Sequence, residues 1–564
     1  MKKLLSLTLA LVLSLAVCDA ASCAARHKIT SKTFPIYNDN TSRAEMPLYF
    51  LDGVTDLPYI EANDWLEMLT QLYDNKVKFT MSAEGSVVTY SRYSNLYSEN
   101  IPVTLDFKKD VICFQDYNLF SMSADQSAIL DLTSVSGFDE EGKATLIQKV
   151  NKGTLARYGD DLKIRLGDYG IDLIAQDGLY LIPLQTVSDL FIAPVFLTSL
   201  YFNGQCMILS DDISDSKELY YAAPTGERSK ELTKFGYGEL CMMLDNVYGL
   251  KETHEIKSFG QLFHEVGFEN VLQGPRVVDA DKTIYRLITD YLDDNHSKWH
   301  AFSYLAGPND YSFTGVSRVR VGSHLERQSN ARAKFYPDGV PGYEEVGNTA
   351  FITFDEFAIQ YEPDDYYRIE NPLDFPDTDT IGLIIKAHAQ INRENSPIEN
   401  VVIDLSANRG GVADTAIFTI AWYLGEASVG MKDTMTGAMC SSTYRADVNR
   451  DRVFDERDTV SDKNLFCLIA PGSFSCGNLV PCIFKESGKV TLLGRTSGGG
   501  SCIVQPISSA WGSSFQISGS RRISFMKNGS FYDVDRGADP DFVITRPEKY
   551  YDRAALVDYI NSLY

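Results

Sequence analysis

Between residues 350 and 493, short apolar runs alternate with segments of helical periodicity, and this alternation limits the possible folds more than any other feature. The runs have the length and composition of buried strands, and they cover residues 350–354, 380–385, 401–405, 464–470 and 490–493. An apolar helix leads from the third run through Trp422, and another helix lies between the last two runs. Strands that alternate with helices are typical of an α/β core, so we predict one here.

The residues before this core divide into a β-rich part and a helical part. From about 47 to 209, apolar runs such as 87–90 are mixed with hairpin signals such as Asn203-Gly204, which predict a β-rich α+β domain. Residues 211–228 are polar and aperiodic, like a linker, and residues 229–292 have helical periodicity. We therefore predict an N-terminal binding or spacer domain at 35–215. A second domain follows at 225–564, with its helical segment before the α/β core and an irregular stretch at 305–345.

Length, charge and cysteine usage exclude several classes of protein. With 564 residues the chain is long enough for more than one domain. Its formal net charge of −24 at pH 7 would repel nucleic acid and anionic lipid, so we expect no nucleic-acid partner. The 10 cysteines form no CxxC pair, which argues against a zinc ribbon or a disulfide scaffold.

The first 25 residues have the order of a secretory signal. Lys2 and Lys3 precede an apolar run at 4–17, and small residues follow at 20–25. The run is too short for a membrane span. We therefore expect an exported protein, located outside the cell or in the cell envelope. Cys18 and Cys23 are imperfect lipidation candidates, so the only membrane contact we expect is a lipid anchor, with ordinary cleavage near Ala24 as the alternative.

Three stretches end regular elements with residues that packing does not explain. Residues 404–411 run from a strand into Gly410-Gly411, a double glycine whose exposed N–H groups suit an oxyanion hole. Ser475 lies at the start of an apolar helix, where N–H groups and the helix dipole favour negative charge. His296 follows the helical segment, and a serine nucleophile needs such a base. Taken singly, these features also fit a plain turn, a helix N-cap and a loop histidine.

The positions of the histidines exclude one class of hydrolase. All 7 histidines precede Ser475, whereas in α/β-hydrolases the catalytic histidine follows the serine. A metallopeptidase of the HExxH type is excluded as well, because no second histidine follows His264-Glu265 at the required spacing.

Motifs at 293–297, 404–411, 473–475, 494–500 and 537–541 occur in an order that resembles a known family. It is the tail-specific, or C-terminal processing, protease family, which includes tricorn-like and retinoid-binding-protein-like branches. The resemblance covers about residues 230–545 and implies a crotonase-like α/β core. It also implies a serine peptidase with Ser475 as the nucleophile. Between His296 and Ala350 we find no PDZ-like peptide-binding segment, which many relatives carry, so the N-terminal domain is a candidate for substrate delivery.

The family uses either a lysine or a histidine as general base. Gly499 stands where the lysine version has its lysine, whereas His296 matches the histidine of the other version. An imidazole also has an intrinsic pKa suited to proton transfer near pH 7. The resemblance therefore implies a Ser475–His296 pair.

A third group normally orients the imidazole. In the tricorn-like branch an acid lies shortly before the motif at 537–541. The closest match to that position here is Val534, with Asp533 and Asp535 on either side. We assign Asp535, and Asp533 or no acid at all are the alternatives.

Oxyanion stabilisation is expected from backbone N–H groups next to the nucleophile. The resemblance implies those of Gly410 or Gly411 and that of Cys476. Cys476 is itself an alternative nucleophile, although the family uses serine.

Residues 447–458 have the pattern of a calcium loop. Oxygen donors stand at loop positions 1, 3, 5, 7, 9 and 12, and they belong to Asp447, Asn449, Asp451, Val453 (through its carbonyl), Asp455 and Asp458. Arg452 stands where such loops have glycine. The pattern predicts a structural calcium ion, with a solvated acidic loop as the alternative.

Together these features predict an exported serine endopeptidase that hydrolyses peptide bonds of protein or peptide substrates through an acyl-enzyme. We expect no cofactor to be required for catalysis. The alternative is a catalytically silent relative whose cleft binds peptides or cell-wall material. The oligomeric state is not indicated by the sequence.

Overall fold

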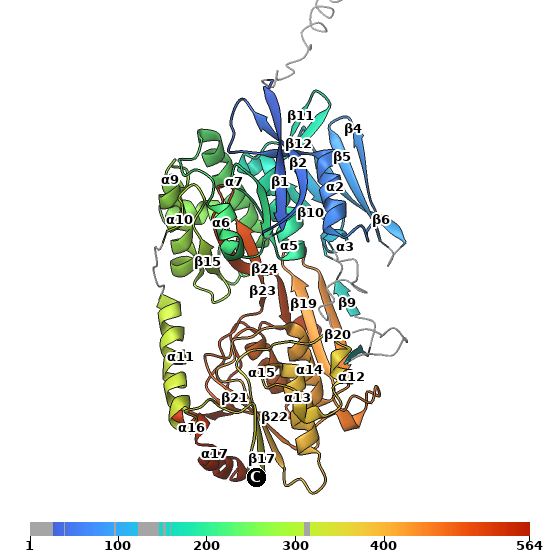
Figure 1. The fold of residues 1–564 in the computed structure, drawn as a ribbon, viewed down its shortest axis with the longest axis vertical. Coiled ribbons are helices and arrows are strands. Elements are labelled where there is room, and N and C mark those ends of the chain that lie inside the picture. The colour runs from blue at the N-terminus through green and yellow to red at the C-terminus, as the bar shows by residue number, and fades with distance from the viewer. Residues whose placement is uncertain are drawn as a thin grey trace, which may run out of the picture.

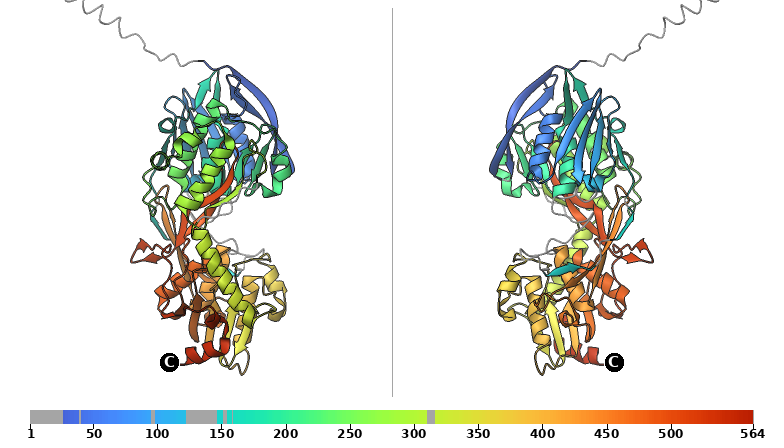
Figure 2. Two further views of the ribbon diagram at one scale, coloured as in Figure 1. Left: turned by 90° about the vertical axis from the view of Figure 1, so that its left-hand side faces the viewer. Right: turned by 90° about the vertical axis from the view of Figure 1, so that its right-hand side faces the viewer.

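The fold is described from a computed structural model, which covers residues 26–38, 40–94, 98–121, 146–150, 154–157, 159–309 and 316–563. Figures 1 and 2 show two lobes: one holds the N-terminal sheets and the helical segment, and the other holds the α/β core. Both the signal-like residues 1–25 and the lipidation candidates Cys18 and Cys23 lie outside the described residues. Among the helices that the structure describes, none combines the length and the apolar character needed to cross a bilayer.

Two sheets form the N-terminal part of the first lobe. The larger has strand order β11-β12-β3-β2-β1-β14-β13 and the smaller β10-β7-β6-β5-β4. Their strands are β1 (Ile29–Asn38), β2 (Thr41–Leu51), β3 (Tyr59–Glu61), β4 (Phe79–Glu84), β5 (Val87–Ser94), β6 (Glu99–Asp106), β7 (Val111–Phe114), β10 (Leu162–Arg165), β11 (Ile174–Gln176), β12 (Leu179–Pro183), β13 (Ser199–Phe202) and β14 (Met207–Ser210). The helices among them are α2 (Ala62–Leu72), α3 (Tyr117–Ser121), α4 (Leu184–Val187), the π-helix η2 (Ser188–Ile192) and α5 (Ala193–Phe196). The predicted strand at 87–90 and the hairpin around Asn203-Gly204 are confirmed.

The predicted helical segment packs against these sheets. It contains α6 (Lys217–Tyr220), α7 (Lys230–Val247), α8 (Phe259–Glu265), α9 (Glu269–Leu272), α10 (Val277–Arg286) and the π-helix η4 (Leu287–Leu292). Helix α7 begins where Ser229 caps the N–H of Leu232, as expected of a serine N-cap. Trp65 of α2, Leu240 of α7 and Trp511 are buried in one hydrophobic cluster. The core of the first lobe therefore continues across the boundary that we place between residues 215 and 225.

A six-stranded sheet is the centre of the second lobe. Its order is β16-β17-β18-β21-β22-β27, and all neighbours are parallel except β16 and β17. The strands are β16 (Tyr343–Val346), β17 (Thr349–Thr353), β18 (Asn400–Asp404), β21 (Asn464–Ile469), β22 (Val490–Gly494) and β27 (Phe542–Val543). The apolar runs at 350–354, 401–405, 464–470 and 490–493 thus supply four of these strands, and the predicted α/β core is confirmed.

Helices cover both faces of this sheet, because alternate side chains of a buried strand point to opposite faces. Ile352 packs with α13 (Thr380–Ile391), α14 (Ala413–Leu424) and α15 (Cys476–Ser487), whereas its neighbour Phe351 packs with α16 (Glu548–Tyr551) and α17 (Arg553–Asn561). The short helix α12 (Asp365–Arg368) joins the first group through Tyr366.

Two predictions for this region are wrong. Residues 380–385, predicted as a strand, form the first turns of α13, because the Asp379 carboxylate accepts the N–H of Gly382 and caps the helix. Residues 305–345, predicted as irregular, contain α11 (Val316–Phe335), a long helix of low mean hydropathy without an apolar stripe. Figure 1 shows α11 running along one side of the molecule from the first lobe to the second.

A third large sheet connects the lobes. It has strand order β15-β24-β19-β20-β8, with β23 on β24 and β9 on β20. These strands are β8 (Ile147–Lys149), β9 (Thr154–Arg157), β15 (Lys298–Ala301), β19 (Ala427–Asp433), β20 (Met439–Ala446), β23 (Cys502–Ser508) and β24 (Ser514–Ser524). One end of β24 pairs with β15 of the first lobe and the other end with β19 of the second. A small hairpin of β25 (Met526–Lys527) and β26 (Ser530–Phe531) follows.

Candidate active site

Ser475 lies between strand β21 and helix α15 in a strained backbone conformation. Its φ is 56° and its ψ is −124°, a region that side-chain-bearing residues avoid unless the surroundings hold them there. The N–H of Ser475 donates to the carbonyl of Gly499 at 2.9 Å. The side chain of the neighbouring Ser473 fastens the turn, since its hydroxyl donates to the Leu405 carbonyl at 2.7 Å and accepts the Ala470 N–H at 3.0 Å.

The double glycine after β18 lies against this serine. A Cβ added to Gly410 would stand 2.6 Å from the Cβ and 3.1 Å from the Oγ of Ser475, and the φ of Gly410 is 98°. Both the space and the backbone conformation therefore require glycine. The turn at residues 404–411 thus contacts Ser475 through Gly410.

The expected oxyanion donors differ in their availability. The N–H of Gly410 donates to Asn408 Oδ1 at 2.9 Å, so it is already bonded within its own turn. Within the described ranges, the N–H groups of Gly411 and Cys476 donate to no acceptor. These two N–H groups are therefore available as hydrogen-bond donors.

The thiol of Cys476 is a poor nucleophile. Burial raises its pKa to about 12, and its Sγ lies 3.3 Å from the carbonyl oxygen of Gly411. Since the thiolate is the reactive form, this environment favours Ser475. The cysteines that the structure describes are free thiols.

His296 comes from the first lobe and lies next to the serine turn. Its ring centroid is 4.5 Å from that of Phe474, the residue before Ser475. Its carbonyl accepts a hydrogen bond from Gln516 Nε2 of β24 at 2.6 Å. Burial lowers the pKa of the imidazole, and the nearby charges of Asp294 and Asp535 only partly oppose this effect. Among the described residues, no hydrogen bond joins the imidazole to Ser475 or to a carboxylate.

Asp535 is near the imidazole but is bonded elsewhere. Its Oδ1 accepts the N–H groups of Gly500 at 3.1 Å and Ser501 at 2.7 Å, and its Oδ2 accepts the Ser501 hydroxyl at 2.7 Å. The guanidinium of Arg522 also bonds its Oδ2 and pairs with Asp533. Burial acts to raise the pKa of Asp535, but Arg522 and Ser501 outweigh burial, and the pKa lies below its usual value.

The structure adds Asp294 to the residues around His296. Its carboxylate accepts the N–H groups of His296 and Ser297, and it accepts the hydroxyl of Tyr248, the residue that follows α7. Sequence reasoning did not single it out. The signal that was available is its position two residues before the histidine, which permits an Asx turn.

The predicted calcium loop has the turns of such a loop but lacks a compact acidic cluster. Asp447 accepts the Arg452 N–H, and Asn449 and Asp451 accept the N–H groups two residues further on. The described residues contain no group of three His, Cys, Asp or Glu side chains arranged to hold a metal.

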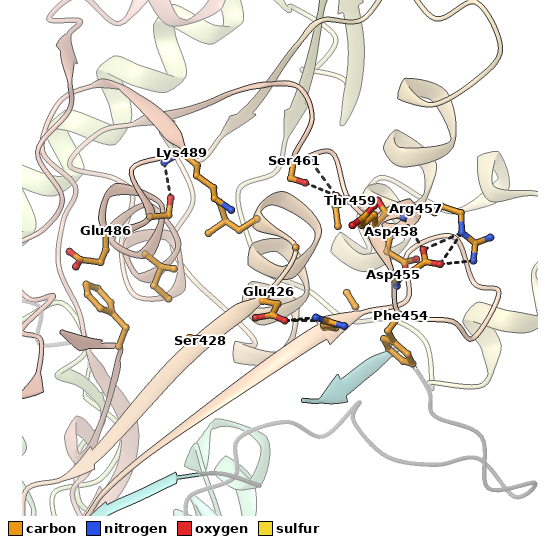
Figure 3. A pocket seen from close by; sticks show the side chains of 18 of the residues that line it. Glu426, Ser428, Phe454, Asp455, Arg457, Asp458, Thr459, Ser461, Glu486 and Lys489 are labelled. Atoms are coloured by element: carbon orange, nitrogen blue, oxygen red, sulfur yellow. Dashed lines mark hydrogen bonds and ion pairs between the residues drawn. The ribbon is translucent and has the colours of Figure 1, made fainter. Parts of the chain in front are cut away.

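Charges near the end of this loop are partly neutralised. Arg457 pairs with Asp451 and Asp455 at 2.8 Å each. Figure 3 shows Arg457 facing Asp455 at the wall of a surface cavity of about 940 Å³. The calcium hypothesis stays a prediction.

Comparisons with known proteins identify the segment that carries Ser475. Residues 374–544 match the model of Peptidase family S41. They include Ser475, Gly410, Gly411 and Asp535, whereas His296 precedes them. A search of the curated proteins found no match.

Solved structures similar to this chain include those of a processing protease, a peptidase and a lipoprotein. The photosystem II D1 C-terminal processing protease is 17% identical over 37% of this chain and 46% of its own, with a TM-score of 0.26. A putative peptidase from Parabacteroides merdae is 12% identical over 57% and 93%, with a TM-score of 0.40. A lipoprotein from Streptococcus agalactiae is 13% identical over 56% and 91%, with a TM-score of 0.33.

The matched part of the chain spans less than half the length of the D1 processing protease. The assignment therefore stands on the family match and on the order of motifs, which agree over residues 404–541. By these two criteria residues 374–544 are similar to peptidase family S41, a family of serine peptidases.

Proposed function

We propose that the protein is an exported serine endopeptidase that hydrolyses protein or peptide substrates through an acyl-enzyme. The observation that carries the proposal is the strained backbone of Ser475. This residue lies against Gly410, and the preceding residue, Phe474, contacts the ring of His296. Export is supported by the signal-like sequence of residues 1–25.

In the proposed reaction, Ser475 Oγ attacks the carbonyl carbon of the scissile bond while His296 takes the hydroxyl proton. The N–H groups of Gly411 and Cys476 stabilise the negative charge that develops on the carbonyl oxygen. The imidazolium then gives its proton to the leaving amine, and the C–N bond breaks. Water, activated by the neutral imidazole, releases the acyl group from Ser475.

The imidazole must move slightly to reach the hydroxyl, because no hydrogen bond joins them among the described residues. Such bonds often tighten only when substrate is bound. His296 follows η4 of the first lobe, whereas Ser475 directly precedes α15 of the second. A small closing of the lobes on a peptide would therefore supply this movement.

Replacing Ser475 by alanine tests the proposal. We expect kcat on casein or a peptide library to fall about 10⁴-fold or more, because the nucleophile is lost. The control is Cys476→Ala, which keeps the backbone N–H and removes only the buried thiol, and it should retain activity. If Ser475→Ala keeps the wild-type rate, the proposal is wrong. If neither protein cleaves any substrate but both bind peptides or cell-wall material, the silent relative is the correct description.

A further inference from the structure

We propose that Asp294 is the positioning residue of His296 and the main stabiliser of its protonated form, a role that the sequence assigns to Asp535. This inference rests on the proposed function, since it concerns the same base. It follows from the hydrogen bonds of the two carboxylates and from the charges that remain on them.

Asp294 fixes the backbone on which the imidazole is carried. Its Oδ1 accepts the N–H of His296 at 3.1 Å and that of Ser297 at 2.7 Å. Its Oδ2 accepts the Ser297 hydroxyl at 2.7 Å. The chain after η4 is thereby folded into a tight turn around one carboxylate, which limits the directions in which the His296 side chain can point.

Two further elements hold this carboxylate in place. The hydroxyl of Tyr248, at the end of α7, donates to Oδ2 at 2.9 Å. The hydroxyl of Ser518 in β24 donates to Oδ1 at 2.8 Å. Gln516 of the same strand also bonds the His296 carbonyl. The base is therefore connected to α7 and β24 through neutral donors.

The two candidate carboxylates differ in how much of their charge is neutralised. Asp535 bonds the Arg522 guanidinium, so much of its negative charge is balanced at close range. All donors to Asp294 are neutral N–H or O–H groups, and no cation pairs with it among the described residues. A carboxylate that is hydrogen-bonded only by neutral groups acts more strongly on a neighbouring imidazole than a carboxylate that is paired with a cation.

The charged groups that act on the imidazole are Asp294, Asp535 and Arg409. Asp294 is the largest influence that raises the pKa of His296, Asp535 is second, and Arg409 lowers it. Asp294 thus opposes the effect of burial when the imidazole takes a proton from Ser475. It does so through the field and through the backbone, without touching the reacting atoms.

The test compares Asp294→Asn with Asp535→Asn. His296 is titrated by NMR in a Ser475→Ala background, with His296→Gln to assign its signal. We expect Asp294→Asn to lower the pKa of His296 by about one unit, and Asp535→Asn to lower it less. In the Ser475 protein, Asp294→Asn should move the acidic limb of the kcat/KM profile to lower pH and reduce kcat/KM by about 10²-fold or more.

A second variant keeps the test decisive if Asp294→Asn does not fold. Tyr248→Phe keeps the carboxylate and removes a donor that shares its charge, so it should raise the pKa of His296. An unchanged pKa in both variants, or a larger shift in Asp535→Asn, would overturn the inference. The titration does not depend on cleavage, so its result stands apart from the Ser475→Ala assay that decides the proposed function.

Discussion

The backbone of Ser475 shows how one residue can depend on the absence of a side chain in another. Its φ of 56° keeps the hydroxyl at the surface of the turn, and Gly410 leaves the space that this needs. Strain of this kind persists only where the surroundings enforce it. Ser475 and Gly410 therefore form one structural unit.

Replacing Gly410 by alanine should reduce both activity and stability. The new Cβ would lie 2.6 Å from that of Ser475 and displace the nucleophile, so we expect kcat/KM to fall about 10²-fold or more. The φ of 98° adds backbone strain of about 1–3 kcal/mol. Peptidase assays and thermal unfolding of the same preparation measure the two effects.

Gly425→Ala is the matched control for this substitution. Gly425 also has a positive φ, 93°, but the nearest atom to an added Cβ is 4.0 Å away. It should lose stability while it keeps activity. Equal activity of the two variants would show that the contact between Gly410 and Ser475 does not matter for the reaction.

For single residues, the sequence predicts which side chains approach one another better than it predicts which charges are neutralised by a partner. The order of the motifs predicts that Ser475, the double glycine and His296 form one site. In the structure Gly410 lies against Ser475, and the ring of His296 lies 4.5 Å from that of Phe474. The bond between Asp535 and Arg522 could not be predicted, because Arg522 belongs to no recognisable motif. Only its position near the end of β24 brings its guanidinium to the carboxylate.

Among the elements, four of the predicted core strands are correct because buried parallel strands are continuous apolar runs. The error at α13 has the same origin, since residues 380–385 are equally apolar and contain β-branched residues. Only the cap at Asp379 marks the segment as a helix. Helix α11 is not predictable from periodicity, because it has no apolar stripe.

The loop at residues 447–458 provides a prediction for an element. We propose that calcium binds there, because Asp447 is fully buried and its Oδ1 finds no hydrogen-bond partner among the residues that the structure describes. Burial raises the pKa of Asp458 to about 6, and the charge of Asp447 adds to this effect. A divalent cation would relieve the repulsion between these carboxylates. Thermal unfolding should therefore occur a few degrees higher in calcium than in a chelator.

The control for calcium is the variant Asp447→Asn, which removes the unpartnered charged oxygen. Its unfolding temperature should no longer respond to calcium. Asp462→Asn, which changes an exposed acid outside the loop, should respond like the wild type. If calcium leaves the unfolding temperature of the wild type unchanged, the loop is an acidic turn held by Arg457.

On the scale of the whole molecule, a buried pair of acids connects three parts of the chain. Asp189 of η2 and Glu239 of α7 are each 1% exposed and share a hydrogen bond. Thr186 donates to Glu239 at 2.8 Å, and Gln185 donates to Asp189 and to Ser508 of β23 at 2.9 Å each. The pair thus lies where the N-terminal sheets, the helical segment and the connecting sheet meet.

This pair should make the protein less stable as the pH rises. Burial raises the pKa of Glu239 from 4.5 to about 8 and that of Asp189 well above its ordinary value. The folded protein therefore holds a proton that the unfolded chain releases above about pH 4.5. The contribution of the pair is fully present below that pH and is lost as the pH rises through about 8. Denaturant unfolding between pH 5 and 9 measures it.

Glu239→Gln carries no ionisable group at this position, so its free energy of unfolding should decline less across that range. Glu231→Gln, at an exposed acid in the first turn of the same helix, should follow the wild type. A wild-type stability that rises steadily from pH 5 to 9 would contradict the shared proton.

Strand β24 is the last of the large strands in the chain. Its Gln516 nevertheless bonds His296, which lies more than 200 positions earlier. A chain still on the ribosome without residues 514–524 lacks the partner strand of β15 and two of the side chains that fix the histidine turn. We therefore expect the histidine turn to become fixed only after residues 514–524 have been synthesised.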